Sequence, residues 1–215
     1  MTPSPVQVHR LVLGPVQTNA YLLGDPTTAE AVVIDPAWEG ERLAGELDRR
    51  GWRLTAVWLT HAHFDHFGGA AGLAERFPVP IAMHPADQPL WRMQGGAPLF
   101  GFERFDPGPE PTIDLEHGMQ IRGVGLDFEV RHVPGHTPGH VLFYAPALRA
   151  AFCGDLVFAG GVGRTDLPGG SWEQLLSGIR QQVLTLPDET VLYPGHGAET
   201  TVGAERAENP FLALA

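Results

Sequence analysis

Lysine is absent from this chain of 215 residues. All 14 basic residues are arginine, against 25 acidic ones, and the formal net charge is −11. The absence excludes Schiff-base catalysis and any phosphate-binding loop that depends on a lysine. A nucleic-acid surface needs clustered basic residues that neutralise phosphates, so the charge also argues against nucleic-acid binding. We therefore expect no nucleic-acid partner, and the oligomeric state stays open.

Cysteine and long apolar runs are also scarce. Cys153 is the single thiol, so the chain can form no internal disulfide and no thiolate metal cage, which fits a reducing compartment. No segment approaches the ~18 apolar residues of a membrane span, and residues 1–10 carry no apolar run of the signal-peptide type. These features predict a cytoplasmic protein without a membrane partner.

Length and composition predict one domain over residues 1–215. A chain of this length buries a sizeable core, and its 43% apolar and 18% charged residues are ordinary for a globular protein. The 27 glycines and 20 prolines imply many short elements. No low-complexity tract or charge block marks a linker between two folding units.

Strand-like and helix-like patterns follow one another in two similar halves. In the first half we expect strands at 6–13, 20–24, 31–34, 54–60 and 80–85, and helices at 38–50 and 69–76. In the second half we expect strands at 111–122, 126–133, 140–145, 149–153 and 190–196, and helices at 172–184 and 202–207. Residues 86–110 read as an irregular, lid-like insertion with exposed aromatics. The pattern predicts an α/β fold, a four-layer αββα sandwich of two mixed sheets with outer helices.

Histidine and aspartate gather in the segment THAHFDH at 60–66, which follows an apolar strand and precedes two glycines. Neutral imidazole nitrogen and carboxylate oxygen suit Zn²⁺, Fe²⁺ and Mn²⁺. Further residues of these types each follow a glycine at the end of a β-type run, so they can project into a shared cleft. These are His136, Asp155 and His196. Three imidazoles and one carboxylate in a single loop have no obvious packing purpose, and the pattern predicts a metal site.

The remaining histidines need no metal. A single histidine is more often a surface residue or a hydrogen-bonded core residue than a ligand. We interpret three in this way: His9, His84 and His117. For His132 and His140 two roles stay open: a structural hydrogen bond, or a hydrogen bond that orients a neighbouring metal ligand. Thr60 and Thr137 are open for the same reason.

Four ordered motifs, THAHFDH, GHTPGH, GD and PGHG, resemble those of the metallo-β-lactamase superfamily. The resemblance is greatest to the glyoxalase II-like hydrolases in their short single-domain form, and it runs from about Val12 to His196. It implies that the chain binds two divalent metal ions, with Zn²⁺ as the preferred ion and Fe²⁺ or Mn²⁺ as alternatives. It also implies which residues hold them: His61, His63 and His136 hold one ion, Asp65, His66 and His196 hold the other, and Asp155 bridges both.

The resemblance implies hydrolysis of a thioester such as S-D-lactoylglutathione by metal-bound hydroxide. Two neighbouring cations lower the pKa of a shared water and polarise the carbonyl that it attacks. As catalytic residues, Asp65 and Asp155 are expected to orient the hydroxide. Arg164 occupies the place of a family residue that binds a carboxylate of glutathione, with an internal salt bridge to Asp166 as the alternative. Asp35 resembles the family's aspartate that orients a metal-binding loop.

The chain also departs from the glutathione-binding form of the family. That form has an aromatic hydroxyl at the position of Asp166 and a tyrosine near the last metal histidine, where this chain has 197–199 (GAE). It also has a separate helical domain that this sequence does not contain. A thioester of another low-molecular-weight thiol is therefore an open alternative.

Three further alternatives stay open. The chief rival is a mononuclear iron persulfide dioxygenase, which the segment GRTD at 163–166 resembles. Its iron would be held by His61, His136 and Asp155, because oxygen chemistry needs a triad of ligands with open positions. The others are a lactonase and a non-catalytic module that binds a metal or a partner, in which the aromatics of 86–110 would form the contact surface.

Overall fold

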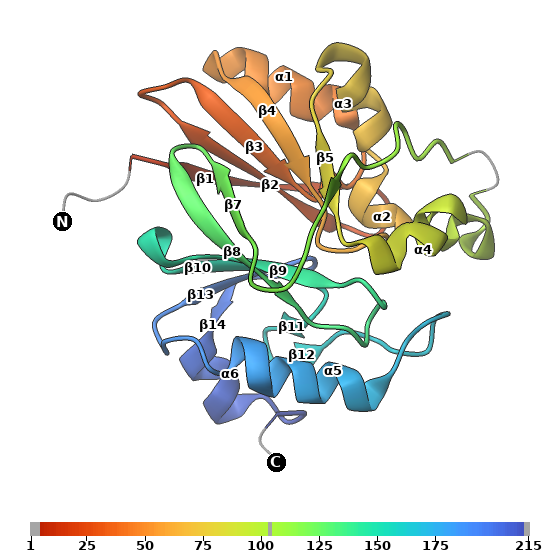
Figure 1. Cartoon of the computed structure of the whole chain (residues 1–215), viewed down its shortest axis with the longest axis vertical. Coiled ribbons are helices and arrows are strands. Elements are labelled where there is room, and N and C mark those ends of the chain that lie inside the picture. The colour runs from red at the N-terminus through yellow and green to blue at the C-terminus, as the bar shows by residue number, and fades with distance from the viewer. Residues whose placement is uncertain (1–4, 103–104, 213–215) are drawn as a thin grey trace.

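The computed structural model describes residues 5–102 and 105–212. The first half of the chain forms a mixed six-stranded sheet (Figure 1). Its strands lie in the order of the sequence: β1 (Gln7–Leu13), β2 (Thr18–Asp25), β3 (Glu30–Ile34), β4 (Arg53–Trp58), β5 (Ile81–Met83) and β6 (Ile113–Asp114). The pairs β1–β2 and β2–β3 are antiparallel, and the remaining pairs are parallel. The predicted strands of this half are confirmed, with ends that differ by a few residues.

A second mixed sheet contains the other half, in the order β14-β13-β10-β9-β8-β7. Its strands are β7 (Gln120–Gly123), β8 (Leu126–His132), β9 (Val141–Ala145), β10 (Ala150–Gly154), β13 (Val191–Pro194) and β14 (Thr200–Thr201). Only β10 and β13 pair in parallel. A short hairpin of β11 (Val157–Phe158) and β12 (Gly161–Val162) stands apart from both sheets. The sequence did not predict this hairpin or β14.

Helices cover the outer faces of the two sheets (Figure 1). The first sheet is covered by α1 (Gly40–Arg50) and α3 (Ala70–Arg76), and the second by α5 (Trp172–Gly178) and α6 (Val202–Glu208). Shorter helices complete the chain: α2 (Phe64–Phe67), η1 (Pro85–Asp87), α4 (Gln88–Arg92), η2 (Gln94–Phe100), η3 (Pro146–Leu148) and the π-helical turn η4 (Ile179–Val183). The predicted αββα sandwich is confirmed.

The alternation of apolar residues along the strands explains the layers. In β3, Ala31 and Val33 face the outer helices, whereas Val32 and Ile34 face the second sheet, because successive side chains point to opposite faces of a strand. Both sets are fully buried. A strand that is apolar on both faces is expected in a sheet that is covered on both sides.

The prediction of an irregular lid with exposed aromatics at residues 86–110 is wrong for the described part of this segment. Residues 103–104 lie outside the described residues. The segment contains η1, α4 and η2, and most of its aromatics pack inward. Trp91 is 2% exposed and stacks on Phe67 with 4.2 Å between the ring centroids, and Phe105 is also buried. Phe100 alone keeps a large exposed fraction, at 45%. Burial of apolar area therefore outweighs the many glycines and prolines that suggested a loose segment.

Two other predictions need correction. The helix expected from Trp38 begins at Gly40, because Ala37 and Glu39 adopt left-handed backbone conformations that do not continue a helix. The strand expected at 111–122 is two strands, β6 and β7. A turn at Gly118, with φ of 81°, separates them.

The strand ends determine where the predicted ligands lie. The segment that carries His61 follows β4, Asp155 follows β10, and His196 follows β13, while His136 lies in the loop between β8 and β9. These ends meet at the same edge of the sandwich (Figure 1). Among the described helices, we find none with the length and apolar character needed to cross a membrane.

We predict that Trp58→Ala lowers the free energy of unfolding by about 3–5 kcal/mol, because deleting a fully buried aromatic leaves a cavity. Trp58 is 1% exposed and lies between the sheets, with its ring 5.0 Å from that of Phe128 and 5.4 Å from that of Phe143. Urea denaturation measures the change. Trp172→Ala is the matched control, because Trp172 is 46% exposed, and its cost should stay below about 1 kcal/mol. Equal losses in the two variants would contradict the packing described here.

Candidate metal centre

The segment THAHFDH lies in the loop from β4 into α2 and is buried throughout. Thr60 is anchored at the start of the loop: its backbone N–H and its hydroxyl both donate to Asp35, at 2.7 and 2.6 Å. His63 has an extended backbone and precedes the four-residue helix that carries Asp65 and His66. The change from extended chain to helix therefore turns successive side chains toward a common centre.

The first cluster contains three buried imidazoles, those of His61, His63 and His136. Their candidate ligand atoms all lie within 4.8 Å of one another. The Nδ1 atom of His63 is 2.9 Å from the Nε2 atom of His136. Their exposed fractions are 0%, 6% and 2%, so solvent hardly reaches this set.

The second cluster contains Asp65, His66 and His196, again within 4.8 Å. The Oδ2 atom of Asp65 lies 3.2 Å from Nε2 of His196 and 3.5 Å from Nε2 of His66. His66 is fully buried, whereas the side chain of His196 is 30% exposed. The second cluster is therefore the more open of the two.

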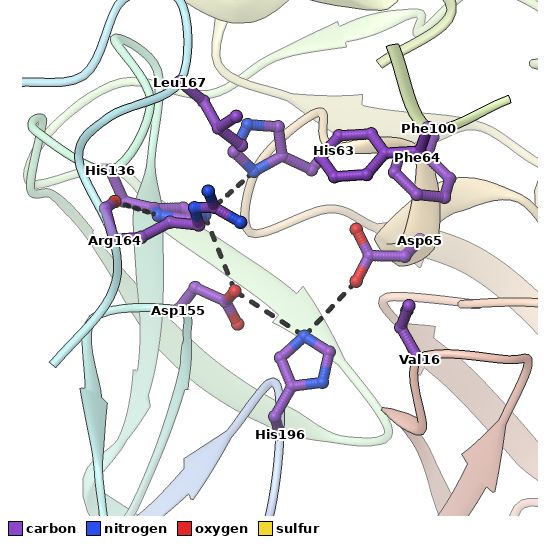
Figure 2. A pocket seen from close by; sticks show the side chains of 10 residues that line it. All are labelled: Val16, His63, Phe64, Asp65, Phe100, His136, Asp155, Arg164, Leu167 and His196. Carbon is purple, nitrogen blue, oxygen red and sulfur yellow. Dashed lines mark hydrogen bonds and ion pairs between the residues drawn. The ribbon is translucent and has the colours of Figure 1, made fainter. Parts of the chain in front are cut away.

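Asp155 lies between the clusters (Figure 2). Its Oδ2 atom is 3.5 Å from Nε2 of His136 and 3.6 Å from Nε2 of His196, and its Oδ1 atom is 3.4 Å from Nε2 of His66. One carboxylate thus contacts imidazoles of both sets. The structure brings the seven side chains together, and their role as metal ligands stays a prediction.

Partners on the far side of the imidazole rings orient their Nε2 atoms. Asp35 accepts a hydrogen bond of 2.9 Å from Nδ1 of His66, and the Arg164 carbonyl accepts one of 2.7 Å from Nδ1 of His136. Asp35 also lies within 4.8 Å of His61 and His66. Because both of its oxygens already accept from Thr60 and His66, we assign it an orienting role.

The site passes a test of fit for metal ions. The Nε2 atom of His61 is buried and has no hydrogen-bond partner among the residues that the structure describes. The buried Nε2 atom of His66 likewise has no hydrogen bond there, only the carboxylate contacts of 3.4 and 3.5 Å given above. A buried imidazole nitrogen without a partner is costly unless something else binds it. Imidazoles and carboxylates are the donor set that Zn²⁺, Fe²⁺ and Mn²⁺ accept. The residues present therefore fit one ion in each cluster.

The first cluster is prepared to bind a cation. Burial lowers the pKa of His63 to about 3, and it holds the pKa values of His61 and His136 below the ordinary value for histidine. These imidazoles are neutral near pH 7, and the neutral form is the one that binds metals.

The second cluster carries charges that compensate one another. Burial opposes protonation of His66, but the carboxylates of Asp65 and Asp155 raise its pKa well above the ordinary value. Burial likewise opposes protonation of His196, whose hydrogen bond to Asp65 raises its pKa. In return, the histidines lower the pKa of Asp65 to about 2 and that of Asp155 further, although burial acts in the opposite direction. Without metal, the ionised carboxylates of this cluster therefore favour the protonated forms of its imidazoles.

Two residues that the sequence analysis did not single out support this centre from β2. The hydroxyl of Thr18 donates to Oδ2 of Asp65 at 2.9 Å. The backbone N–H of Asn19 donates to the Gly195 carbonyl at 2.7 Å, and its side-chain amide donates to the carbonyls that flank this loop. Both residues are buried at the start of a strand whose middle, residues 20–23, is apolar. Two polar residues directly before an apolar strand segment were the sequence signal that could have identified Thr18 and Asn19.

The open histidines and Cys153 now have defined places. The backbone N–H of Asp155 donates to Nε2 of His140, and the His140 ring stacks on His61 with centroids 4.6 Å apart. His132 hydrogen-bonds the Pro138 carbonyl and stacks on His84, away from the seven predicted ligands. Cys153 is fully buried, and burial raises the pKa of its thiol to about 12. This thiol belongs to the core.

Arg164 lines the same cavity as the candidate ligands but is already paired. The cavity has a volume of about 170 Å³ and is bounded by metal-site residues and by four apolar side chains (Figure 2). The apolar ones are Val16, Phe64, Phe100 and Leu167. Nε and Nη2 of Arg164 each donate to Asp166 at 2.7 Å, so the internal salt bridge that was the alternative is present.

Metal binding should release protons, because His66 and His196 must become neutral to donate their Nε2 lone pairs. We predict proton release on Zn²⁺ binding near neutral pH, and an affinity that falls as the pH is lowered and protons compete with the ion. Calorimetric titrations of the metal-free protein in buffers of different ionisation enthalpy measure the protons released. Binding whose heat is independent of the buffer would contradict this charge distribution.

Known proteins are similar to this chain in sequence and in overall structure. A family model described as Metallo-beta-lactamase superfamily matches residues 13–196. Hydroxyacylglutathione hydrolase GloC of Haemophilus influenzae is 38% identical over 198 residues, which are 91% of this chain and 93% of that protein. The structure of the BLEG-1 B3 metallo-beta-lactamase superimposes with a TM-score of 0.89 at 36% identity, over 96% of this chain and 99% of that one. The di-iron-bound form of TTHA1623 superimposes with a TM-score of 0.87 at 44% identity, over 95% and 100%. With a family match over most of its length and relatives of this identity and coverage, the chain belongs to the metallo-β-lactamase superfamily.

Proposed function

We propose that this chain is a dinuclear metal-dependent hydrolase of a thioester, such as S-D-lactoylglutathione. The superfamily consists mostly of metal-dependent hydrolases, and a Bacillus subtilis relative that is 36% identical carries the name probable metallo-hydrolase YqgX. The observation that carries the proposal is the position of Asp155, whose carboxylate contacts imidazoles of two clusters at one cavity. This arrangement supports a pair of ions with a shared carboxylate.

Two divalent ions, when bound, supply a water of lowered pKa and an electrophile for the carbonyl oxygen of the substrate. The chain supplies the orientation. Asp65 and Asp155 keep ionised carboxylates that accept hydrogen bonds from the nucleophilic water and so orient it, and the Thr18 hydroxyl fixes Asp65. A thiol has an ordinary pKa near 8.5, so a thiolate leaves without a proton donor. The described lining of the cavity offers no side chain placed for that task other than the site histidines.

The walls of the cavity support an acyl compound as the substrate. Val16 and Phe100 are each 45% exposed at the cavity, and Phe64 lies beside the predicted ligand His63. Apolar side chains around a few convergent polar groups are the usual composition of a small-molecule site. The name of the GloC relative adds support for a thioester of glutathione.

The mononuclear persulfide dioxygenase remains the second candidate for the site, since it needs only His61, His136 and Asp155. It gives no role to the buried Nε2 atom of His66, which lacks a hydrogen-bond partner among the described residues. The di-iron form of the similar TTHA1623 structure supports a site for two ions. We therefore prefer the dinuclear hydrolase, with Zn²⁺ or Fe²⁺ as the ions.

The extent and location of the protein complete the proposal. We propose one domain over residues 1–215, because the second hydrophobic cluster includes residues of both sheets, such as Trp58 and Phe143. We also propose a cytoplasmic location, because the buried and unpaired thiol of Cys153 suits a reducing compartment.

We expect Asp155→Ala to lose metal content and to lower kcat for thioester hydrolysis by about 100-fold or more, because the ions contribute several kcal/mol of charge stabilisation. Metal content and turnover are measured on the same sample, with a panel of thioesters, lactones and a persulfide. Asp127→Ala is the control, since that carboxylate is 64% exposed and lies on β8. Full thioesterase activity in Asp155→Ala would refute the proposal, and oxygen uptake with the persulfide would select the dioxygenase.

Asp166 is expected to restrict the thiol carrier. Because the Asp166 carboxylate already accepts hydrogen bonds from Arg164, a substrate carboxylate must displace Asp166 or bind elsewhere. We predict that Asp166→Ala lowers KM for a glutathione thioester by about two- to fivefold at most, since an exposed ion pair contributes little. KM for a thioester of an uncharged thiol should stay constant, and a further Arg164→Ala change should abolish the gain. Parallel changes for both substrates would contradict this role.

A further inference from the structure

Asp87 is a buried carboxylate close to the metal centre, and the sequence analysis gave it no role. It ends η1 and is 0% exposed. Its Oδ2 atom accepts hydrogen bonds from the Ala62 backbone N–H at 3.0 Å and from the Thr137 hydroxyl at 2.8 Å. Its Oδ1 atom accepts from the Gly139 backbone N–H at 2.6 Å. Burial raises the pKa of the Asp87 carboxyl, and the hydrogen bonds from Thr137, Ala62 and Gly139 act in the opposite direction, toward the ionised form.

The donors belong to the two loops that carry the first cluster. Ala62 stands between His61 and His63 in the loop from β4 to α2. Thr137 follows His136 in the loop from β8 to β9. These loops come from different sheets, so a single carboxylate fixes the segments of all three imidazoles relative to one another.

The loop after His136 approaches Asp87 as closely as the backbone permits. A Cβ atom added at Gly139 would lie 2.7 Å from Cγ of Asp87, closer than carbon atoms can approach. Glycine is therefore required at this position. The close approach also selects a carboxylate over an amide, because an amide has one oxygen for three donors and would turn its N–H₂ group toward one of them.

We propose that Asp87 is a positioning residue that holds His61, His63 and His136 in place to bind one metal ion. The inference rests on the two-metal centre of the proposed function. Asp35 orients His66 of the second cluster through a direct hydrogen bond, whereas Asp87 acts on the first cluster through the backbone and a hydroxyl. Asp35 also reaches His61 through the Thr60 hydroxyl, whereas the hydrogen bonds of Asp87 go only to the two loops of the first cluster. Loss of Asp87 should therefore affect one ion more than the other.

The test measures metal affinity in variants of the full chain. Chelator competition with Zn²⁺ gives the affinity for each equivalent bound by the wild type, Asp87→Asn and Thr137→Val. We expect Asp87→Asn to weaken one equivalent by about 10- to 100-fold, the usual effect of removing an outer partner of a metal ligand, and to leave the other within about threefold. Thr137→Val keeps the carboxylate and two donors, so it should weaken the same equivalent by a smaller factor.

Glu205 provides a matched control. It is also buried and accepts from a backbone N–H, a threonine hydroxyl and an amide: those of Gly160, Thr200 and Asn209. It joins α6 to the β11–β12 hairpin, and the hydrogen bonds that it makes with described residues reach neither of the two loops of the first cluster. Glu205→Gln and Thr200→Val should therefore lower the Tm of the metal-free protein as the Asp87 and Thr137 variants do, and leave both metal affinities unchanged.

Three results would overturn the inference. The first is that Asp87→Asn binds both Zn²⁺ equivalents with wild-type affinity, and the second is that it weakens both equivalents equally. The third is that Glu205→Gln, at an equal loss of Tm, weakens Zn²⁺ binding as much as Asp87→Asn does. If Asp87→Asn does not fold, Thr137→Val decides in the same way. The proposed function fails separately, if wild-type protein that binds two ions hydrolyses no thioester.

Discussion

The carboxylate of Asp155 lies within 3.6 Å of imidazole nitrogens from three parts of the chain, and the rest of the site is arranged around it. It is 8% exposed, and an ionised carboxylate in such a place is costly unless charges or donors compensate it. Here His66 and His196, with raised pKa values, provide the compensation. Bound cations would provide it more strongly, because each carries two charges at the same place. The site therefore has a physical reason to bind divalent ions.

Support for this arrangement comes from polar groups spread over both sheets. Asp35 and Thr18 fix residues of the second cluster from the first sheet, and Asn19 holds the loop that carries His196. Asp87 joins the two loops of the first cluster. Because each of these groups is buried and hydrogen-bonded, the ligand geometry depends on the rigid core and not on the ions alone. The proposed hydrolysis uses this rigidity to orient a water between ionised carboxylates.

The sequence predicted the sandwich and the seven converging residues because both have local signals. Alternating apolar residues such as Val32 and Val33 indicate a sheet covered on both faces, and histidine or aspartate after a strand indicates a side chain at the sheet edge. Asp87 and Thr18 gave no such signal, because their partners lie far away in sequence and are often backbone groups. Trp91 was predicted wrongly because a segment rich in glycine and proline shows no periodicity, although its aromatic rings still pack on the core.

A crystal structure of the metal-loaded protein, with ions identified by anomalous scattering, tests the central claim most directly. The account predicts two ions, one among His61, His63 and His136, the other among Asp65, His66 and His196, with the Asp155 carboxylate bound to both. One ion alone, held by three of these residues while Asp65 and His196 point away from it, would contradict the account.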